Sequence, residues 1–245
     1  MAQPPERIQD ALSDRQSPAE REKIVRRLPP DSGLDAIGVR MKEVFDTAKE
    51  WTDLDLSHIP DLLASPWYEM RMVGVSVLDF KARRRGLDDD GRRRLYESYM
   101  NHHEFINIWD LVDRSAPRVV GWYLLDKSRQ PLFDLARSDA AIERRTAITA
   151  SFWLIRQGDL DDPLALADLL LDDPSELVTK PVGTALREVG KIDRQRLLGF
   201  LARHRHRMSR PTLRLATYLL PDDIERSLRE QTRSQPGSGT GPMPR

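Results

Sequence analysis

The chain has 245 residues, of which 39% are hydrophobic and 32% are charged, and its formal net charge is zero. These values fit a soluble globular protein with one large domain or two small ones. The absence of cysteine excludes disulfides, thiolate metal sites and a cysteine nucleophile, and it suits a reducing cytoplasm. No apolar run approaches the roughly 20 residues of a membrane span, and the polar start lacks the apolar core of a signal peptide. We therefore expect a cytoplasmic protein.

Helical periodicity dominates the chain. The pattern at residues 39–51 places apolar side chains at three- and four-residue steps, and Gly158 is suited to cap a long helix that precedes it. No stretch alternates in the manner of a strand, so we expect no sheet. Further helices are predicted at residues 59–65, 66–85, 90–100, 106–113, 117–127, 130–138, 140–158, 163–173, 175–191, 193–204 and 209–220.

The helices recur in pairs about every 35 to 40 residues, which is typical of helical-repeat solenoids. The repeats lack strict self-similarity, so a plain α-helical bundle is the alternative fold. We predict peripheral, partly flexible N-terminal helices at residues 1–33 and a helical-repeat domain at residues 34–228. The Gly-, Ser- and Pro-rich residues 229–245 are predicted to form a disordered tail.

Charge is unevenly distributed near the C-terminal end. Residues 157–179 contain seven acidic residues and no Lys or Arg, whereas residues 180–214 contain ten Lys or Arg and two acidic residues. Such a basic segment indicates a surface that meets an anion, for which phosphate is the obvious candidate. The alternative is a solvated helical face that its acidic neighbour balances, and charge alone does not separate the two.

The motif WDLVD places Trp109 and Asp113 four residues apart, so on a helix they share one face. One interpretation is a core tryptophan beside an aspartate that is paired with Arg114 or Arg118. The other is a site that handles a cation. Asp110 points elsewhere on the same helix, and we assign it a structural role.

The histidines do not form a metal motif. HRH at residues 204–206 and NHHE at residues 101–104 lack the spacing of two histidines one helical turn apart, and HExxH is absent. No phosphate-binding glycine loop with GK[ST] occurs either, and no Ser–His–Asp set can be singled out. We expect neither a metal nor a cofactor.

Six motifs occur in a fixed order and together resemble one family. They are GVR (38–40), SPWYEMR (65–71), WDLVD (109–113), ERRTAI (143–148), KPVGTALREVGK (180–191) and MSRPTLRLA (208–216). The pattern is similar to the HEAT-like-repeat DNA alkylation repair proteins, the AlkD-like DNA glycosylases, over residues 34–225. The resemblance implies an all-α solenoid with a concave basic cleft.

The same resemblance implies removal of cationic N3- or N7-alkylated purines from duplex DNA without metal or cofactor. Asp113 and Trp109 match the carboxylate and one tryptophan of the family's cleft, and Arg145 matches an arginine that holds the DNA backbone. Arginine suits phosphate through its planar fork. Candidate phosphate contacts are Arg40, Lys180, Arg187, Arg210 and Arg214. For Arg187, a carboxylate partner within the solenoid is the equal alternative.

Three positions depart from the family pattern. Thr184 and Ile142 stand where tryptophans are usual, and Leu215 stands where a tyrosine is common. Loss of the tryptophan at position 184 removes one wall of the expected aromatic clamp. The protein is then a weakened enzyme, an enzyme with altered substrate choice, or a scaffold without catalysis.

The residues suit glycosidic chemistry, because a departing cationic base leaves an oxocarbenium-like sugar. A fixed carboxylate such as Asp113 stabilises that charge, and the face of Trp109 can contact a cation. We therefore expect a monomeric DNA glycosylase that acts on double-stranded DNA with alkylated bases and associates with the nucleoid when bound. The alternative is a non-catalytic helical-repeat protein that binds DNA or another protein.

Overall fold

The computed structural model describes residues 3–222, and the predicted tail at residues 229–245 lies outside them. The described part is all-α, with no strand and one isolated bridge between Asp35 and Trp67. Its α-helices are α1 (Pro4–Ser13), α2 (Pro18–Val25), α3 (Met41–Glu50), α4 (Ile59–Leu63), α5 (Tyr68–Ala82), α6 (Asp89–Met100), α7 (Trp109–Ala116), α8 (Gln130–Ala136), α9 (Ala141–Arg156), α10 (Asp161–Leu169), α11 (Glu176–Ile192), α12 (Arg194–His204) and α13 (Arg210–Thr217). Shorter turns are η1 (Leu56–His58), η2 (His103–Phe105), η3 (Pro117–Gly121), η4 (Tyr123–Asp126) and η5 (Arg205–Arg207).

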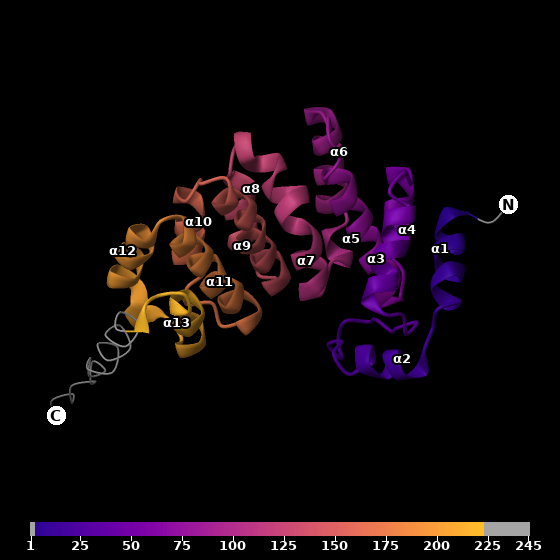
Figure 1. Ribbon diagram of the computed structural model, residues 1–245, viewed down its shortest axis with the longest axis horizontal. Coiled ribbons are helices and arrows are strands. Elements are labelled where there is room, and N and C mark those ends of the chain that lie inside the picture. The colour runs from indigo at the N-terminus through magenta and orange to yellow at the C-terminus, as the bar shows by residue number, and fades with distance from the viewer. Residues whose placement is uncertain (1–2, 223–245) are drawn as a thin grey trace, which may run out of the picture.

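The helices form an arched row from α1 to α13 in two layers (Figure 1). In one layer, α3, α5, α7, α9, α11 and α13 each pack against the next member of that series. In the other layer, α4 and α6 pack on α5, α8 and α10 pack on α9, and α12 packs on α11. This pairing is the arrangement of a helical-repeat solenoid, so the predicted fold class is confirmed.

Two predicted helices differ in detail from those observed. The helix expected from residue 106 begins at Trp109, so the tryptophan occupies the first helical position. The α-helix expected at residues 117–127 is instead a short π-helix, η3, followed by a short 3-10 helix, η4. A Cβ on Gly121 would lie 2.1 Å from the carbonyl oxygen of Ala150, so only glycine allows η3 to lie this close to α9.

Glu69 of the motif SPWYEMR anchors the segment that precedes α3. Its fully buried carboxylate accepts hydrogen bonds from the backbone N–H groups of Ile37, Gly38 and Val39 at 2.9, 2.8 and 3.0 Å. Gly38 has a φ of 100°, a conformation that favours glycine. Two motifs far apart in sequence, GVR and SPWYEMR, therefore meet in one hydrogen-bond cluster.

Arg71 of the same motif anchors the segment that precedes α7. Its Nε donates to the carbonyl oxygen of Ser65 at 2.7 Å, and its Nη1 donates to the carbonyl oxygen of Phe105 at 2.8 Å. The Nη1 atom also donates to the side chain of Asn107 at 3.2 Å. These contacts fix the entry into α7, on which Trp109 and Asp113 lie.

The N-terminal helices extend the same core. α1 packs against α3 and α5, and it buries Ile8 and Leu12 completely. The boundary predicted between residues 33 and 34 stays a prediction. Within residues 3–222, no helix combines the length and the apolar character that crossing a bilayer would require.

Candidate active site

A cleft of about 570 Å³ opens between α7, α9 and α11, and we call it the central cleft. Its volume lies in the range of about 300 to 1,000 Å³ that is typical of ligand pockets. The three predicted catalytic residues, Trp109, Asp113 and Arg145, line it together. The other lining residues are Phe152, Ser175, Glu176, Leu177, Lys180, Pro181 and Thr184.

Trp109 and Asp113 share one face of α7, as their spacing predicts, and that face is open to the central cleft. Trp109 is 46% exposed, so its interpretation as a core residue is wrong. The side chain of Asp113 is 39% exposed. An indole and a carboxylate are therefore both accessible from the cleft, one helical turn apart.

Asp113 is paired with Arg145 of α9. Arg145 Nε lies 2.9 Å from Asp113 Oδ1 and Nη2 lies 2.7 Å from Oδ2, which is a bidentate pair. The Arg145 guanidinium also lies 5.6 Å from the centre of the Trp109 ring, within the range of a cation–π contact. The alternative prediction, that Asp113 pairs with Arg114 or Arg118, is wrong, because both of these arginines face Asp79.

Pro181, inside α11, helps to hold Arg145 in place. Proline lacks an N–H group, so the carbonyl oxygen of Leu177, four residues earlier, has no helical donor from that position. Arg145 Nη1 donates to this oxygen at 2.6 Å. The side chain of Arg145 is only 9% exposed, because it spans from α7 to α11 through the floor of the cleft.

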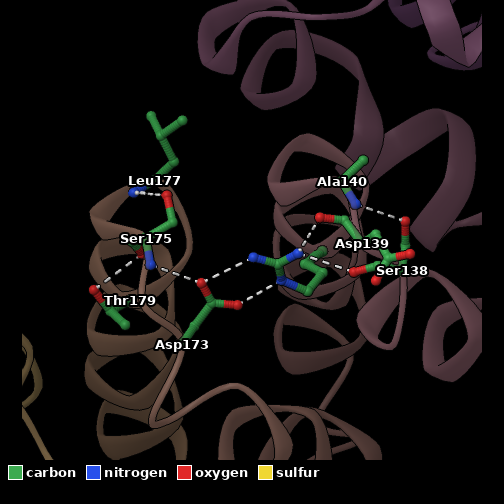
Figure 2. A network of polar contacts seen from close by, with 8 residues as sticks. Ser138, Asp139, Ala140, Asp173, Ser175, Leu177 and Thr179 are labelled. Atoms are coloured by element: carbon green, nitrogen blue, oxygen red, sulfur yellow. Dashed lines mark hydrogen bonds and ion pairs between the residues drawn. The ribbon is translucent and has the colours of Figure 1, made fainter.

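Arg144, the neighbour of Arg145, ties α9 to the start of α11 (Figure 2). Its Nε and Nη2 donate to the two carboxylate oxygens of Asp173 at 2.6 and 3.1 Å. Asp173 Oδ1 accepts from the backbone N–H of Ser175 at 2.8 Å, and the Ser175 hydroxyl accepts from the N–H of Leu177. The two arginines of the motif ERRTAI thus position the wall of the central cleft that α11 supplies.

Asp110 lies outside the central cleft, as its spacing predicts. Its Oδ2 accepts a hydrogen bond of 2.7 Å from the hydroxyl of Tyr68. Burial raises the pKa of Asp110 and also that of the Tyr68 hydroxyl. The contact joins α5 to α7, which is a structural role.

The other predicted phosphate contacts do not gather at the central cleft. Only Lys180 lines it, and this lysine is paired with Glu176 at 2.7 Å. Arg187 pairs with Glu188 at 3.1 Å and lines a separate hollow that α11, α12 and α13 form. Arg40 lies 3.8 Å from Glu20 near the N-terminal end of the row.

Arg210 and Arg214 are exposed on α13 and make no ion pair with another described residue. Much of the basic segment at residues 180–214 is balanced by its acidic neighbour. Arg207 pairs with Asp168 and Asp172 at 2.6 Å each. Arg196 pairs with Asp161. The balanced-face interpretation therefore accounts for these arginines, whereas those of α13 stay available.

The positions that depart from the family pattern lie in different surroundings. Thr184 lines the central cleft, where its hydroxyl donates to the carbonyl oxygen of Lys180 at 3.2 Å. Ile142 is half-buried and packs against the core at the start of α9. Leu215 packs closely on Gly183. A Cβ added to Gly183 would lie 2.8 Å from the Cβ of Leu215. Only Thr184 leaves the cleft with a smaller wall.

Two of the histidines make contacts within the fold. His103 is buried, and its Nε2 lies 2.8 Å from the hydroxyl of Thr146, next to Arg145. His204 lies 3.0 Å from Asp168 and stacks on Phe200. Across residues 3–222, no group of three or more acidic or histidine side chains is placed to hold a metal ion.

We expect the free energy of unfolding to fall as the pH drops below about 6.5. Burial lowers the pKa of His103, so the folded protein favours the neutral imidazole, whereas the unfolded chain binds a proton. For one group the slope is at most about 1.4 kcal/mol per pH unit. Denaturant titrations between pH 5 and 7, with His103→Gln beside the native protein, measure it. An equal slope in both would contradict the assignment.

Comparison with known proteins agrees with the resemblance in the motifs. Residues 8–220 match the model of a family described as DNA alkylation repair enzyme. A solved structure titled "Predicted DNA alkylation repair enzyme from Enterococcus faecalis" superposes with a TM-score of 0.65 at 14% identity, covering 85% of this chain and 98% of that one. That likeness concerns the fold. No curated protein matches the sequence. Because the family match spans most of the chain, this protein belongs to the DNA alkylation repair enzyme family and has a role in the repair of alkylated DNA.

Proposed function

We propose that the protein is a DNA glycosylase that excises cationic N3- or N7-alkylated purines from duplex DNA. The observation that supports this most directly is the joint exposure of Trp109 and Asp113 in the central cleft. A cationic base and an oxocarbenium-like sugar need a negative charge and an aromatic face close together. The cleft offers both on one helix.

In the proposed reaction the C1′–N bond breaks and its electron pair moves to the alkylated base, which leaves as a neutral purine. The positive charge passes to the sugar, where Asp113 stabilises it. Water then adds to C1′ and loses a proton to Asp113 or to solvent. Unmodified purines gain little, because such a base would have to leave the sugar as an anion.

Arg145 has two roles in this proposal. It orients the carboxylate of Asp113 through the bidentate pair, which leaves further lone pairs of Asp113 for the substrate. It also brings a positive charge to the floor of the cleft, where a backbone phosphate can meet it. Trp109 contributes a cation–π contact that is worth roughly 0.5 to 2 kcal/mol.

The test is release of 7-methylguanine and 3-methyladenine from methylated duplex DNA by the purified protein. We expect release without added metal or cofactor. Undamaged duplex serves as the control substrate and should release no base. Native protein that binds the methylated duplex but frees neither purine would contradict the proposal.

A second candidate function is a non-catalytic DNA-binding scaffold, and two observations support it. Both carboxylate oxygens of Asp113 are already engaged by Arg145, which offsets the negative charge. Thr184 in place of an aromatic residue leaves the cleft with a smaller wall. Tight, salt-sensitive DNA binding without base release is the result that this alternative requires.

The proposal includes the setting in which the protein acts. Alkylated double-stranded DNA is the partner, and the protein acts as a cytoplasmic monomer at the nucleoid. Candidate contacts to the phosphates outside the central cleft are Arg40, Arg187, Arg210 and Arg214. Lys180 is the candidate at its edge.

A further inference from the structure

A second hollow of about 330 Å³, which we call the arginine hollow, adjoins the central cleft. Asp113 and Phe152 line both. Four arginines line the arginine hollow, namely Arg83, Arg114, Arg118 and Arg156, and its acidic residues are Asp79 and Asp113. Of these two carboxylates, Asp113 is already paired with Arg145 from the central cleft. Positive charge is therefore in excess.

Asp79 lies within hydrogen-bond distance of only two of the four arginines. Its carboxylate is 1% exposed and lies 2.6 Å from both Arg83 and Arg114. Arg114 also donates to the Ser76 hydroxyl at 2.9 Å and is stacked between rings of α3 and α5. These contacts join α5 to α7 and have an evident structural purpose.

The remaining two arginines lack such a partner. Arg118 has only a long ion pair with Asp79, at 3.9 Å and beyond hydrogen-bond distance, and Arg156 forms no ion pair with any residue from 3 to 222. Both guanidinium groups lie against the ring of Trp153, at 5.2 and 5.8 Å from its centre. Arg118 is partly buried, and removal of a cation from water is costly unless an anion compensates it.

The charges around the hollow favour the binding of an anion. Burial lowers the pKa of Arg118, and the nearby charges of Arg83 and Arg156 lower it further, although the carboxylate of Asp79 acts in the opposite direction. The Trp153 ring, which both arginines contact, stacks on the ring of Trp122 with their centres 4.8 Å apart. This stacking fixes the position of the Trp153 ring. An anion between Arg118 and Arg156 would relieve the repulsion between like charges.

We propose that Arg118 and Arg156 form a binding subsite for one phosphodiester group of the DNA strand whose nucleotide occupies the central cleft. The arginine hollow shares Asp113 with that cleft, so a phosphate there would be close to the reacting nucleotide. Two arginine forks suit a phosphate, which presents several acceptor oxygens. The subsite rests on the proposed function for the identity of the bound strand.

The salt dependence of DNA binding tests this subsite directly. Loss of one phosphate contact lowers the slope of log K against log salt by about 1. We expect the double variant Arg118→Gln/Arg156→Gln to show that change on an unmodified 20-base-pair duplex, with about tenfold weaker binding at 0.1 M salt. Arg26→Gln, at the exposed end of α2, is the matched control and should bind like the native protein.

The conservative double variant Arg118→Lys/Arg156→Lys keeps both charges and should restore most of the slope. If the glutamine variant retains the native slope, the subsite is overturned, whether or not the native protein releases methylated purines. If the slope falls but the native protein releases no base, the subsite stands and the glycosylase proposal fails. Absence of any DNA binding by the native protein would overturn both.

Discussion

Asp113→Asn is expected to lower the rate of base release from methylated duplex DNA by about 100-fold or more, which corresponds to about 2.7 kcal/mol of transition-state stabilisation. Asparagine keeps the shape of the side chain but removes the negative charge that stabilises the developing sugar cation. Substrate binding should change far less, because the phosphate contacts remain. Single-turnover release of 7-methylguanine, with native protein and variant in excess over DNA, measures the chemical step directly.

The variant also has a cost in stability that the assay must separate from catalysis. Arg145 is 9% exposed, and with an amide opposite it loses a charged partner. We expect the free energy of unfolding to fall by about 1 to 3 kcal/mol. Rates should therefore be compared well below the unfolding temperature of the variant, with folding followed by circular dichroism.

Asp46→Asn is the matched control for the change in charge. Asp46 lies on α3 and pairs with Lys42 and Lys49 on the surface. Its replacement should leave the rate of base release within about twofold of native, since surface pairs contribute little. Equal rates for native protein and Asp113→Asn would show that the carboxylate is not catalytic, and the WDLVD motif would then be architecture.

The site could be predicted in part, because the strongest evidence was local. The four-residue spacing of Trp109 and Asp113 fixes a shared face on any helix, and the structure confirms it. The spacing of residues on one helix does not predict the ion-pair partner of Asp113. Arg114 and Arg118 are nearer in sequence, yet Arg145 lies 32 residues away on the next helix of the layer. Which arginine reaches the carboxylate depends on how helices pack.

The arginine hollow also depends on helix packing, so the sequence does not predict it. The densest run of Lys and Arg is at residues 180–214, but several of its arginines pair with acidic neighbours. Arg156 is isolated in sequence, and only its position eleven residues after Arg145 places it on the same helix face. Charge density along a chain does not indicate which arginines lack a carboxylate.

Pro181 shows a further limit of local patterns. Inside a helix it would ordinarily signal a break, yet α11 continues through it from Glu176 to Ile192. The carbonyl group that it leaves without a helical donor, that of Leu177, is used by Arg145. A feature that is unfavourable for the isolated helix becomes part of the site, because the neighbouring helix supplies the missing donor.

Glu69→Gln is expected to lower the free energy of unfolding by about 3 kcal/mol. The two carboxylate oxygens of Glu69 accept three backbone N–H groups from residues 37–39 inside the core. The amide of glutamine has one acceptor oxygen, and its NH2 group must face a donor, so at least one buried N–H loses its partner. The remaining hydrogen bonds also lose their charge assistance.

Urea titration checks this expectation, with Glu97→Gln as control, because Glu97 pairs with Arg93 on the exposed surface of α6. The control should change stability by less than about 0.5 kcal/mol. Since Glu69 does not line the central cleft and contacts the backbone of residues 37–39, base release by the folded variant should match the native rate. A Glu69→Gln protein as stable as the native one would mean that packing, and not these hydrogen bonds, holds the segment before α3. A folded but inactive variant would mean that Glu69 affects the geometry of the central cleft through α5 and α7.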